Sequence, residues 1–175
     1  MDQPLSHAAE EVAVRAHADQ RYGDNPYRVH LAAVVKVLRR FDVTDEAVLA
    51  AGWLHDALED TELTPIGLAR ELGKYQTQQV AAAIAIVDAC TDGNGANRKE
   101  RKARVYRLIP RTKDAVIVKL ADRIANVEAC RESDRTEKLK MYRREQPVFL
   151  AQLGGHGGDI AAAMWAHLGL ILAGA

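Results

Sequence analysis

The stretch that decides the fold is Trp53-Leu54-His55-Asp56-Ala57-Leu58-Glu59-Asp60-Thr61. It lies in an apolar, helix-periodic segment, yet it holds four ionisable side chains, namely His55, Asp56, Glu59 and Asp60. Burying such groups costs free energy unless they are paired or bound to a metal ion. The stretch therefore predicts a helix that carries a functional site, and the rest of the chain must supply what that site lacks.

Helical spacing relates these four side chains to one another. On one continuous helix, neighbours point about 100° apart, and residues three or four apart share a face. His55 and Asp56 would then reach one ion from adjacent sides. Glu59 and Asp60 would border the same cleft.

Two polar side chains elsewhere can complete a metal site. His30 and Asp122 both stand in apolar helical surroundings, and with His55 and Asp56 they supply two imidazoles and two carboxylates. This ligand set suits Mn²⁺, Fe²⁺, Co²⁺ or Zn²⁺ and lacks the thiolates of a structural zinc site. A lone histidine on an apolar face is more often a core histidine, and His17 is interpreted in that way.

Composition indicates one helical domain. The chain has 175 residues, 48% of them hydrophobic and few aromatic, which favours a single domain over residues 1–175 with a real core. Lys+Arg and Asp+Glu both number 24, so the net charge argues for neither nucleic acid nor membrane as a partner. Any site for an anion must be a local cluster of cations.

The cysteines and the chain ends point to a cytoplasmic protein. Cys90 and Cys130 lack CxxC spacing, which favours reduced thiols and leaves a disulfide as the alternative. Residues 1–4 lack the pattern of a signal peptide. The apolar tail, residues 160–175, is shorter than a membrane span.

Helical periodicity dominates the chain, and alternating strand patterns are scarce. Thr44 is the expected cap of the third helix, Pro26 is expected in the first turn of the second, and Pro147 is expected to kink or end the eighth. The fold class is therefore all-α, a single bundle of about nine to ten helices. The expected helices are residues 6–21, 26–41, 45–60, 64–73, 75–90, 97–109, 112–127, 134–153 and 159–172.

Three motifs carry a resemblance to a known family. His30…His55-Asp56…Asp122 resembles the H…HD…D signature of the HD-domain superfamily of metal-dependent phosphohydrolases. The segments 55–60 and 119–126 are similar to the HD-x-x-ED and KLADR-x-x-N motifs of the hydrolase domain in Rel/SpoT alarmone enzymes. The resemblance is closest to the stand-alone, Mesh1-like small alarmone hydrolases. It covers residues 11–153 and leaves out the C-terminal helix, 159–172.

The resemblance implies a compact HD-domain bundle with one bound Mn²⁺, held by the four ligands named above. The implied reaction removes the 3′-pyrophosphate of guanosine tetra- or pentaphosphate (ppGpp or pppGpp) and yields GDP or GTP and pyrophosphate. Glu59 and Asp60 would then handle protons at the attacking water and at the leaving 3′-oxygen. Which acid does which is left open.

The resemblance also implies contacts with a small nucleotide substrate. Arg21 would lie against the guanine, Asn126 would contact the nucleoside, and Arg98 takes the position of a lysine that contacts phosphate. Lys138 and Tyr142 align with a basic residue and a tyrosine near the substrate. The alternatives are that Arg21 is a surface arginine and that Arg98 belongs to a solvated helix face.

The chain departs from the family pattern at several positions. Tyr22 stands where a lysine is common, Leu31 replaces a proline, Asp19 replaces a glycine, and 124–125 reads Ile-Ala in place of Leu-His. No expected metal ligand is lost, so the departures are expected to affect the selectivity for the base and the binding of phosphate.

Two other functions remain open from the sequence. The same site could act on another phosphorylated nucleotide such as NADPH, or the chain could be a non-catalytic nucleotide-binding module. Retention of every ligand and of both acids argues against the second. A ferritin-like di-iron bundle fits less well, because the paired Glu-x-x-His motifs are missing.

Overall fold

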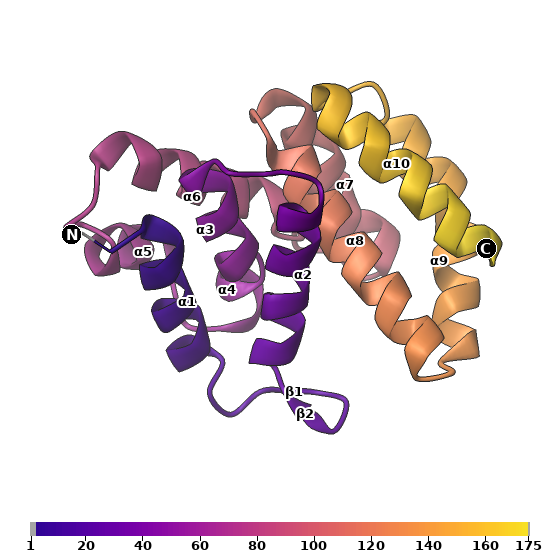
Figure 1. Ribbon diagram of the computed structural model, residues 1–175, viewed down its shortest axis with the longest axis horizontal. Coiled ribbons are helices and arrows are strands. Elements are labelled where there is room, and N and C mark those ends of the chain that lie inside the picture. Colours follow the sequence, from indigo (N-terminus) through magenta and orange to yellow (C-terminus); the bar gives the residue numbers. More distant parts are fainter. Residues whose placement is uncertain (1–2, 175) are drawn as a thin grey trace.

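The computed structural model describes residues 3–174 (Figure 1). These residues form ten α-helices, one 3-10 turn and one pair of two-residue strands, which are joined by loops. The expected all-α fold class is confirmed. The helices are α1 (Leu5–Ala16), α2 (Arg28–Arg40), α3 (Glu46–Leu54), α4 (Ala57–Asp60), α5 (Pro65–Glu71), α6 (Thr77–Cys90), α7 (Arg98–Leu108), α8 (Ala115–Glu132), α9 (Thr136–Leu153) and α10 (Gly158–Ala173). The strands are β1 (Arg21–Tyr22) and β2 (Asn25–Pro26), and the 3-10 turn is η1 (Ile109–Arg111).

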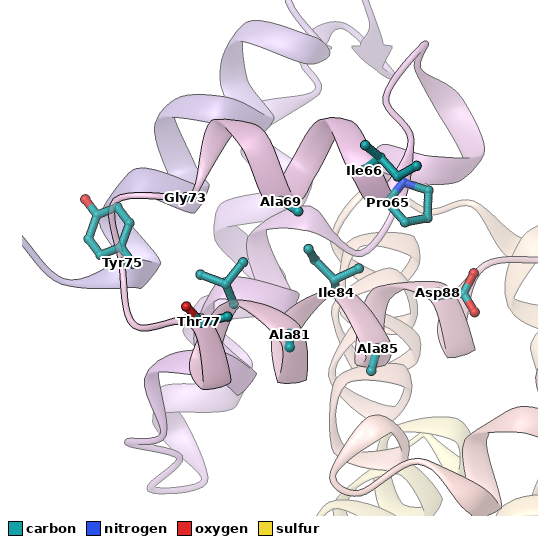
Figure 2. A pocket seen from close by; sticks show the side chains of 11 residues that line it. Pro65, Ile66, Ala69, Gly73, Tyr75, Thr77, Ala81, Ile84, Ala85 and Asp88 are labelled. Atoms are coloured by element: carbon teal, nitrogen blue, oxygen red, sulfur yellow. The ribbon is translucent and has the colours of Figure 1, made fainter.

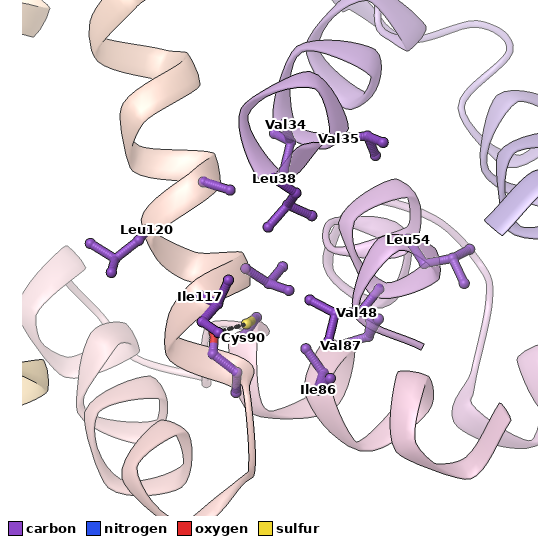
Figure 3. Packing of buried hydrophobic residues seen from close by; sticks show 14 of the residues in the cluster. Val34, Val35, Leu38, Val48, Leu54, Ile86, Val87, Cys90, Ile117 and Leu120 are labelled. Carbon is purple, nitrogen blue, oxygen red and sulfur yellow. Dashed lines mark hydrogen bonds between the residues drawn. The ribbon is translucent and has the colours of Figure 1, made fainter. Parts of the chain in front are cut away.

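Helices α3 and α8 organise the core. Helix α3 packs against α1, α2 and α6, while α8 packs against α2 and α10. Residues 47–54 of α3 are all buried, as expected of a helix that is apolar on every side. Figure 3 shows side chains of four helices meeting in this core, among them Leu38 of α2, Val48 of α3, Val87 of α6 and Ile117 of α8. The core thus holds together the helices from which the predicted metal ligands come.

Two of the expected helix starts are confirmed with their caps. The Thr64 hydroxyl accepts a hydrogen bond from the Gly67 amide at 3.0 Å, with Pro65 in the first turn of α5. The Asn97 side chain accepts from the Glu100 amide at 3.1 Å at the start of α7. Such caps satisfy amides that the first turn of a helix leaves without partners.

The expected helices 6–21 and 26–41 were wrong where they approach each other. Helix α1 ends at Ala16, and β1 pairs antiparallel with β2 in a short hairpin that the sequence did not reveal. Gly23 in its turn has φ of +61°, a conformation that glycine adopts without steric cost. Pro26 therefore lies in a strand, and α2 starts two residues later, at Arg28.

The expected third helix was wrong in two respects. Its cap is Asp45, whose carboxylate accepts from the Ala47 amide at 2.8 Å, and not Thr44. It also breaks at His55-Asp56 into α3 and the short α4. Asp56 has φ −100° and ψ −2°, in the sparsely populated region between helix and strand where many active-site residues are found.

Three smaller expectations can be compared with the structure. Helix α9 continues through Pro147 to Leu153, so the proline does not end it. Cys90 and Cys130 are buried and free, so the alternative of a disulfide was wrong. Within residues 3–174, no helix combines the length and the apolar character needed to cross a membrane.

Gly52 permits the close approach of α2 and α3, and its replacement tests that packing. A Cβ built there lies 2.6 Å from Cδ1 of Leu38, whereas one built at Gly169 of α10 meets nothing within 4 Å. We expect Gly52→Ala to lower the free energy of unfolding by about 1–3 kcal/mol through overpacking. Gly169→Ala should raise it by about 0.5–1 kcal/mol, because alanine favours the helix. Urea denaturation of both variants measures the difference, and a stabilising Gly52→Ala would contradict the packing described here.

Candidate active site

Four side chains from three places in the chain converge on one point. The Nε2 atoms of His30 and His55 lie 3.2 Å apart. Oδ2 of Asp56 is 3.0 Å from Nε2 of His55, and Oδ1 of Asp122 is 3.4 Å from Nε2 of His30. The two histidines are 3% and 2% exposed. All four predicted metal ligands are thus brought together, although the helix that was expected to carry two of them is interrupted.

The donor atoms have the spacing that a bound cation requires. Ligand atoms about 2.1 Å from an ion are about 3.0 Å apart at right angles and about 3.4 Å apart at tetrahedral angles. The separations from a histidine Nε2 to the other donor atoms run from 3.0 to 3.7 Å. The ligand atoms of His30, His55 and Asp56 all lie within 4.8 Å of one another. Nδ1 of His55 lies 2.9 Å from the carbonyl oxygen of Gly52. With Nδ1 as the donor of that bond, Nε2 presents its lone pair to the centre of the cluster.

The electrostatics of the cluster also favour a positive charge at its centre. Burial by itself lowers the pKa of His30, but hydrogen bonds and charge from Asp122 and Asp56 outweigh it and raise the pKa to about 9. The histidines in turn hold the pKa of Asp56 well below its usual value, against the effect of burial. A divalent cation bound by these residues would take over the stabilising role of the protons. The residues present therefore fit a metal ion.

Three polar groups hold the two carboxylates in place. The Tyr27 hydroxyl donates to Oδ2 of Asp56 at 2.5 Å, and burial together with that carboxylate keeps the pKa of Tyr27 far above its usual value. Nζ of Lys119 lies 3.6 Å from Oδ2 of Asp122, and Nδ2 of Asn126 donates to Oδ1 of Asp122 at 2.6 Å. Such outer partners fix the orientation of metal ligands.

Three members of the cluster, His30, Asp56 and Asp122, line a cleft of about 570 Å³, and His55 is buried outside that lining. Four of its lining residues are acidic and four are basic. The acidic ones are Asp56, Glu59, Asp92 and Asp122, and the basic ones are Arg98, Lys102, Lys119 and Lys138. A phosphorylated ligand that reaches the cluster would therefore meet cations nearby.

The two expected catalytic acids are placed differently. Glu59 lines the cleft, and its carboxylate accepts from the Asp92 amide at 3.1 Å. Desolvation raises its pKa. Asp60 lies outside the lining of the cleft and accepts a hydrogen bond from Gln20 at 2.8 Å. The structure places Glu59, and not Asp60, in the lining of the cleft.

Of the residues expected to contact the substrate, four line the cleft and one does not. Arg98, Asn126, Lys138 and Tyr142 all line the cleft. Arg98 is paired with Glu145 at 2.5 Å. Arg21 is exposed on β1 and lies outside the lining.

Sequence reasoning missed several residues of the cleft. Tyr27 and Lys119 bind metal ligands directly, and Lys102 and Asp92 line the wall. The spacing of residues in the sequence could have indicated two of them. Lys119 stands three residues before Asp122 and Lys102 four residues after Arg98, the spacings that place side chains on one helix face. The positions of Tyr27 and Asp92 depend on packing between distant segments.

A second cavity carries no comparable chemistry. It is an apolar groove between α5 and α6, bordered by Ile66, Ala69, Ile84 and Ala85 (Figure 2). Asp88 at its end is bound by Arg104 at 2.8 Å. The candidate functional site is therefore the cleft with the His/Asp cluster.

Fold and site together define a helical protein with a buried, mixed histidine and carboxylate centre of the kind that serves metal-dependent hydrolases. The sequence matches the HD domain family over residues 9–158. The chain belongs to the HD domain family.

Curated relatives have similar sequences. Over 81% of this chain, a Synechocystis protein named "Probable guanosine-3′,5′-bis(diphosphate) 3′-pyrophosphohydrolase" is 31% identical, and a Streptomyces coelicolor "GTP pyrophosphokinase" is 32% identical. Human "Guanosine-3′,5′-bis(diphosphate) 3′-pyrophosphohydrolase MESH1" is 32% identical over 68% of the chain. The alignments span 19%, 16% and 65% of these proteins, respectively.

A solved structure shares the fold. It was published as "A metazoan ortholog of SpoT hydrolyzes ppGpp and plays a role in starvation responses". The two structures agree with a TM-score of 0.72 over 96% of this chain and 95% of the other, at 20% sequence identity. At this identity the likeness establishes the fold.

Metal binding can be tested by thermal stability. A ligand that binds only the folded state raises stability, by about 2.7 kcal/mol at a hundredfold excess over Kd. We expect Mn²⁺ to raise the melting temperature of the chelator-treated protein, and His55→Gln to remove this increase because it deletes a ligand. The matched control is His7→Gln, at an exposed histidine, which should respond like the wild type. An equal response of His55→Gln would contradict the assignment of the cluster as a metal site.

Proposed function

We propose that this chain is a Mn²⁺-dependent hydrolase that removes the 3′-pyrophosphate of ppGpp or pppGpp, giving GDP or GTP and pyrophosphate. The observation that carries the proposal is that one cleft is lined by His30, Asp56 and Asp122 of the His/Asp cluster, by the Glu59 carboxylate and by four basic side chains, with the buried His55 in contact with these ligands. The names of the relatives support the choice of substrate.

The proposed metal ligands and Glu59 would have different roles in the reaction. His30, His55, Asp56 and Asp122 would hold the cation. When bound, such an ion lowers the pKa of a coordinated water and neutralises charge on phosphate. Glu59 is placed to accept the proton that the attacking water loses, and its raised pKa makes it a better base than an ordinary glutamate. The water oxygen would bond to the phosphorus as the bond from phosphorus to the 3′-oxygen breaks, and the 3′-oxygen would take up the proton that Glu59 received.

The basic side chains would bind the polyphosphate. Lys119 stays charged, because Asp122 raises its pKa although burial alone lowers it. Arg98 is oriented by Glu145, which also accepts from Arg123 at 3.1 Å. Arg123 is 5% exposed and lies 4.7 Å from the centre of the Tyr142 ring. This arrangement fixes the position of Arg98 and Tyr142 before a substrate arrives, which reduces the ordering that binding must impose.

Glu59 gives the direct test of the chemistry. We expect Glu59→Gln to lower kcat for release of pyrophosphate from ppGpp by about 10²- to 10⁴-fold, because the amide cannot accept the proton. Binding of Mn²⁺ should stay close to wild type. Glu62→Gln is the matched control, since Glu62 is exposed two positions beyond α4 and outside the cleft.

Two outcomes of these assays would contradict the proposal. The first is wild-type turnover by Glu59→Gln, which would remove the acid from the mechanism. The second is metal-loaded wild-type protein that leaves ppGpp and pppGpp intact. Dephosphorylation of NADPH in a parallel assay would then favour the alternative substrate.

The protonation of Lys102 is expected to make kcat/KM depend on pH. Burial, with Lys119 and Arg98 nearby, lowers its pKa to about 8, so the free protein carries this charge below pH 8 and loses it above. We expect kcat/KM for ppGpp to fall as pH rises through 8. In Lys102→Arg that part of the fall should disappear, since a guanidinium stays protonated. Lys99→Arg, at an exposed lysine of the same helix, should keep the wild-type profile. Identical profiles for all three proteins would contradict a role for Lys102.

A further inference from the structure

Tyr22 is connected to two of the proposed metal ligands, to His30 directly and to Asp122 through Asn126. Its ring is stacked on the ring of His30, with centroids 4.8 Å apart and an angle of 16° between planes. Its hydroxyl donates to Oδ1 of Asn126 at 2.9 Å. Nδ2 of Asn126 in turn donates to Oδ1 of Asp122 at 2.6 Å. One side chain on the β1–β2 hairpin thus touches a ligand from α2 and, through an amide, a ligand from α8.

The hydroxyl of Tyr22 sets the orientation of the Asn126 amide. With the phenol as donor, Oδ1 of Asn126 faces Tyr22 and the amide nitrogen faces Asp122. The amide nitrogen also lies 3.1 Å from the backbone oxygen of Asp122. A flipped amide would set its oxygen against the carboxylate, which is repulsive. The Asp122 atom that accepts the bond is Oδ1, the same atom that faces both histidines.

The surroundings hold Tyr22 in this position. Nζ of Lys138 and Cζ of Arg135 lie 5.7 and 5.8 Å from the centre of its ring, within the range of cation–π attraction. Tyr22 and His30 also border a third cavity, distinct from the α5–α6 groove, on the side of Lys36 and α10. The stacked pair is therefore part of the wall between that cavity and the cleft of the metal cluster.

We infer that Tyr22 is a positioning residue of the metal centre, holding Asp122 through Asn126 and covering one face of His30. The inference rests on the metal site of the proposed function and not on its substrate. Tyr22 is one of the positions at which this chain departs from the pattern of the hydrolases it resembles, where lysine is common. A lysine at this position would have no ring to stack on His30 and no hydroxyl to donate to Asn126.

The test is the affinity for Mn²⁺, measured by isothermal titration of chelator-treated protein without nucleotide. Tyr22→Phe keeps the ring and removes only the hydroxyl. Loss of a group bonded directly to a ligand costs about 10- to 100-fold in metal affinity. Because Tyr22 acts one bond further out, we expect about 3- to 10-fold weaker binding.

The matched control is Tyr75→Phe. The Tyr75 hydroxyl is buried without a hydrogen-bond partner among residues 3–174, and Tyr75 borders the α5–α6 groove, away from the cleft (Figure 2). Its removal should leave Mn²⁺ affinity unchanged. Wild-type affinity in Tyr22→Phe would overturn the inference, even if KM for a nucleotide changed, since that result would assign Tyr22 to substrate contact alone.

A double-mutant cycle tests the route through Asn126. We expect Tyr22→Phe to change Mn²⁺ affinity by less than about twofold in an Asn126→Ala background, because the hydroxyl then has no amide to orient. An undiminished effect in that background would overturn the proposed route. Since no substrate is used, a protein that fails to hydrolyse ppGpp would refute the proposed function and leave this result standing.

Discussion

The structure depends on the burial of two imidazoles and two carboxylates in one small volume. Ionised groups taken out of water are costly unless each finds a partner. Here each ligand finds the others, and an outer set of donors completes the arrangement: the phenol of Tyr27, the ammonium of Lys119 and the amide of Asn126. The apolar contacts of α2, α3 and α8 must be close enough to keep these groups together. The packing of the core therefore also determines the geometry of the site.

The break between α3 and α4 shows how that requirement acts on local structure. The residues from Trp53 to Asp60 have good helical periodicity, yet Asp56 leaves helical geometry at the point where its carboxylate meets Tyr27 and the histidines. Tertiary contacts commonly override helix propensity. Across the same turn, Asp56 and Glu59 line the cleft, whereas His55 is buried outside that lining. A regular helix would place these groups on one continuous face.

The members of the His/Asp cluster could be picked out from sequence because polar residues in apolar, periodic segments conflict with burial unless they serve a purpose. His30, His55, Asp56 and Asp122 all met that test. The helix starts at Thr64 and Asn97 could be predicted because start signals are local. The cap predicted at Thr44 was wrong by one residue, since Asp45 caps α3. The β1–β2 hairpin was not predictable, since strands of two residues are too short to show an alternation of apolar and polar residues. The place of Asp60 outside the cleft and of Lys102 within it depends on the helix break and on how α7 packs, which no short stretch encodes.

The order of the ligands along the chain has a consequence for synthesis. His30, His55 and Asp56 belong to the first third of the sequence, whereas Asp122 follows only after α5, α6 and α7. During translation, the emerging chain therefore holds an incomplete set of ligands until α8 has left the ribosome and closed a long loop. The cluster is in this way completed only at a late step of folding, after α8 has joined the helices that precede it.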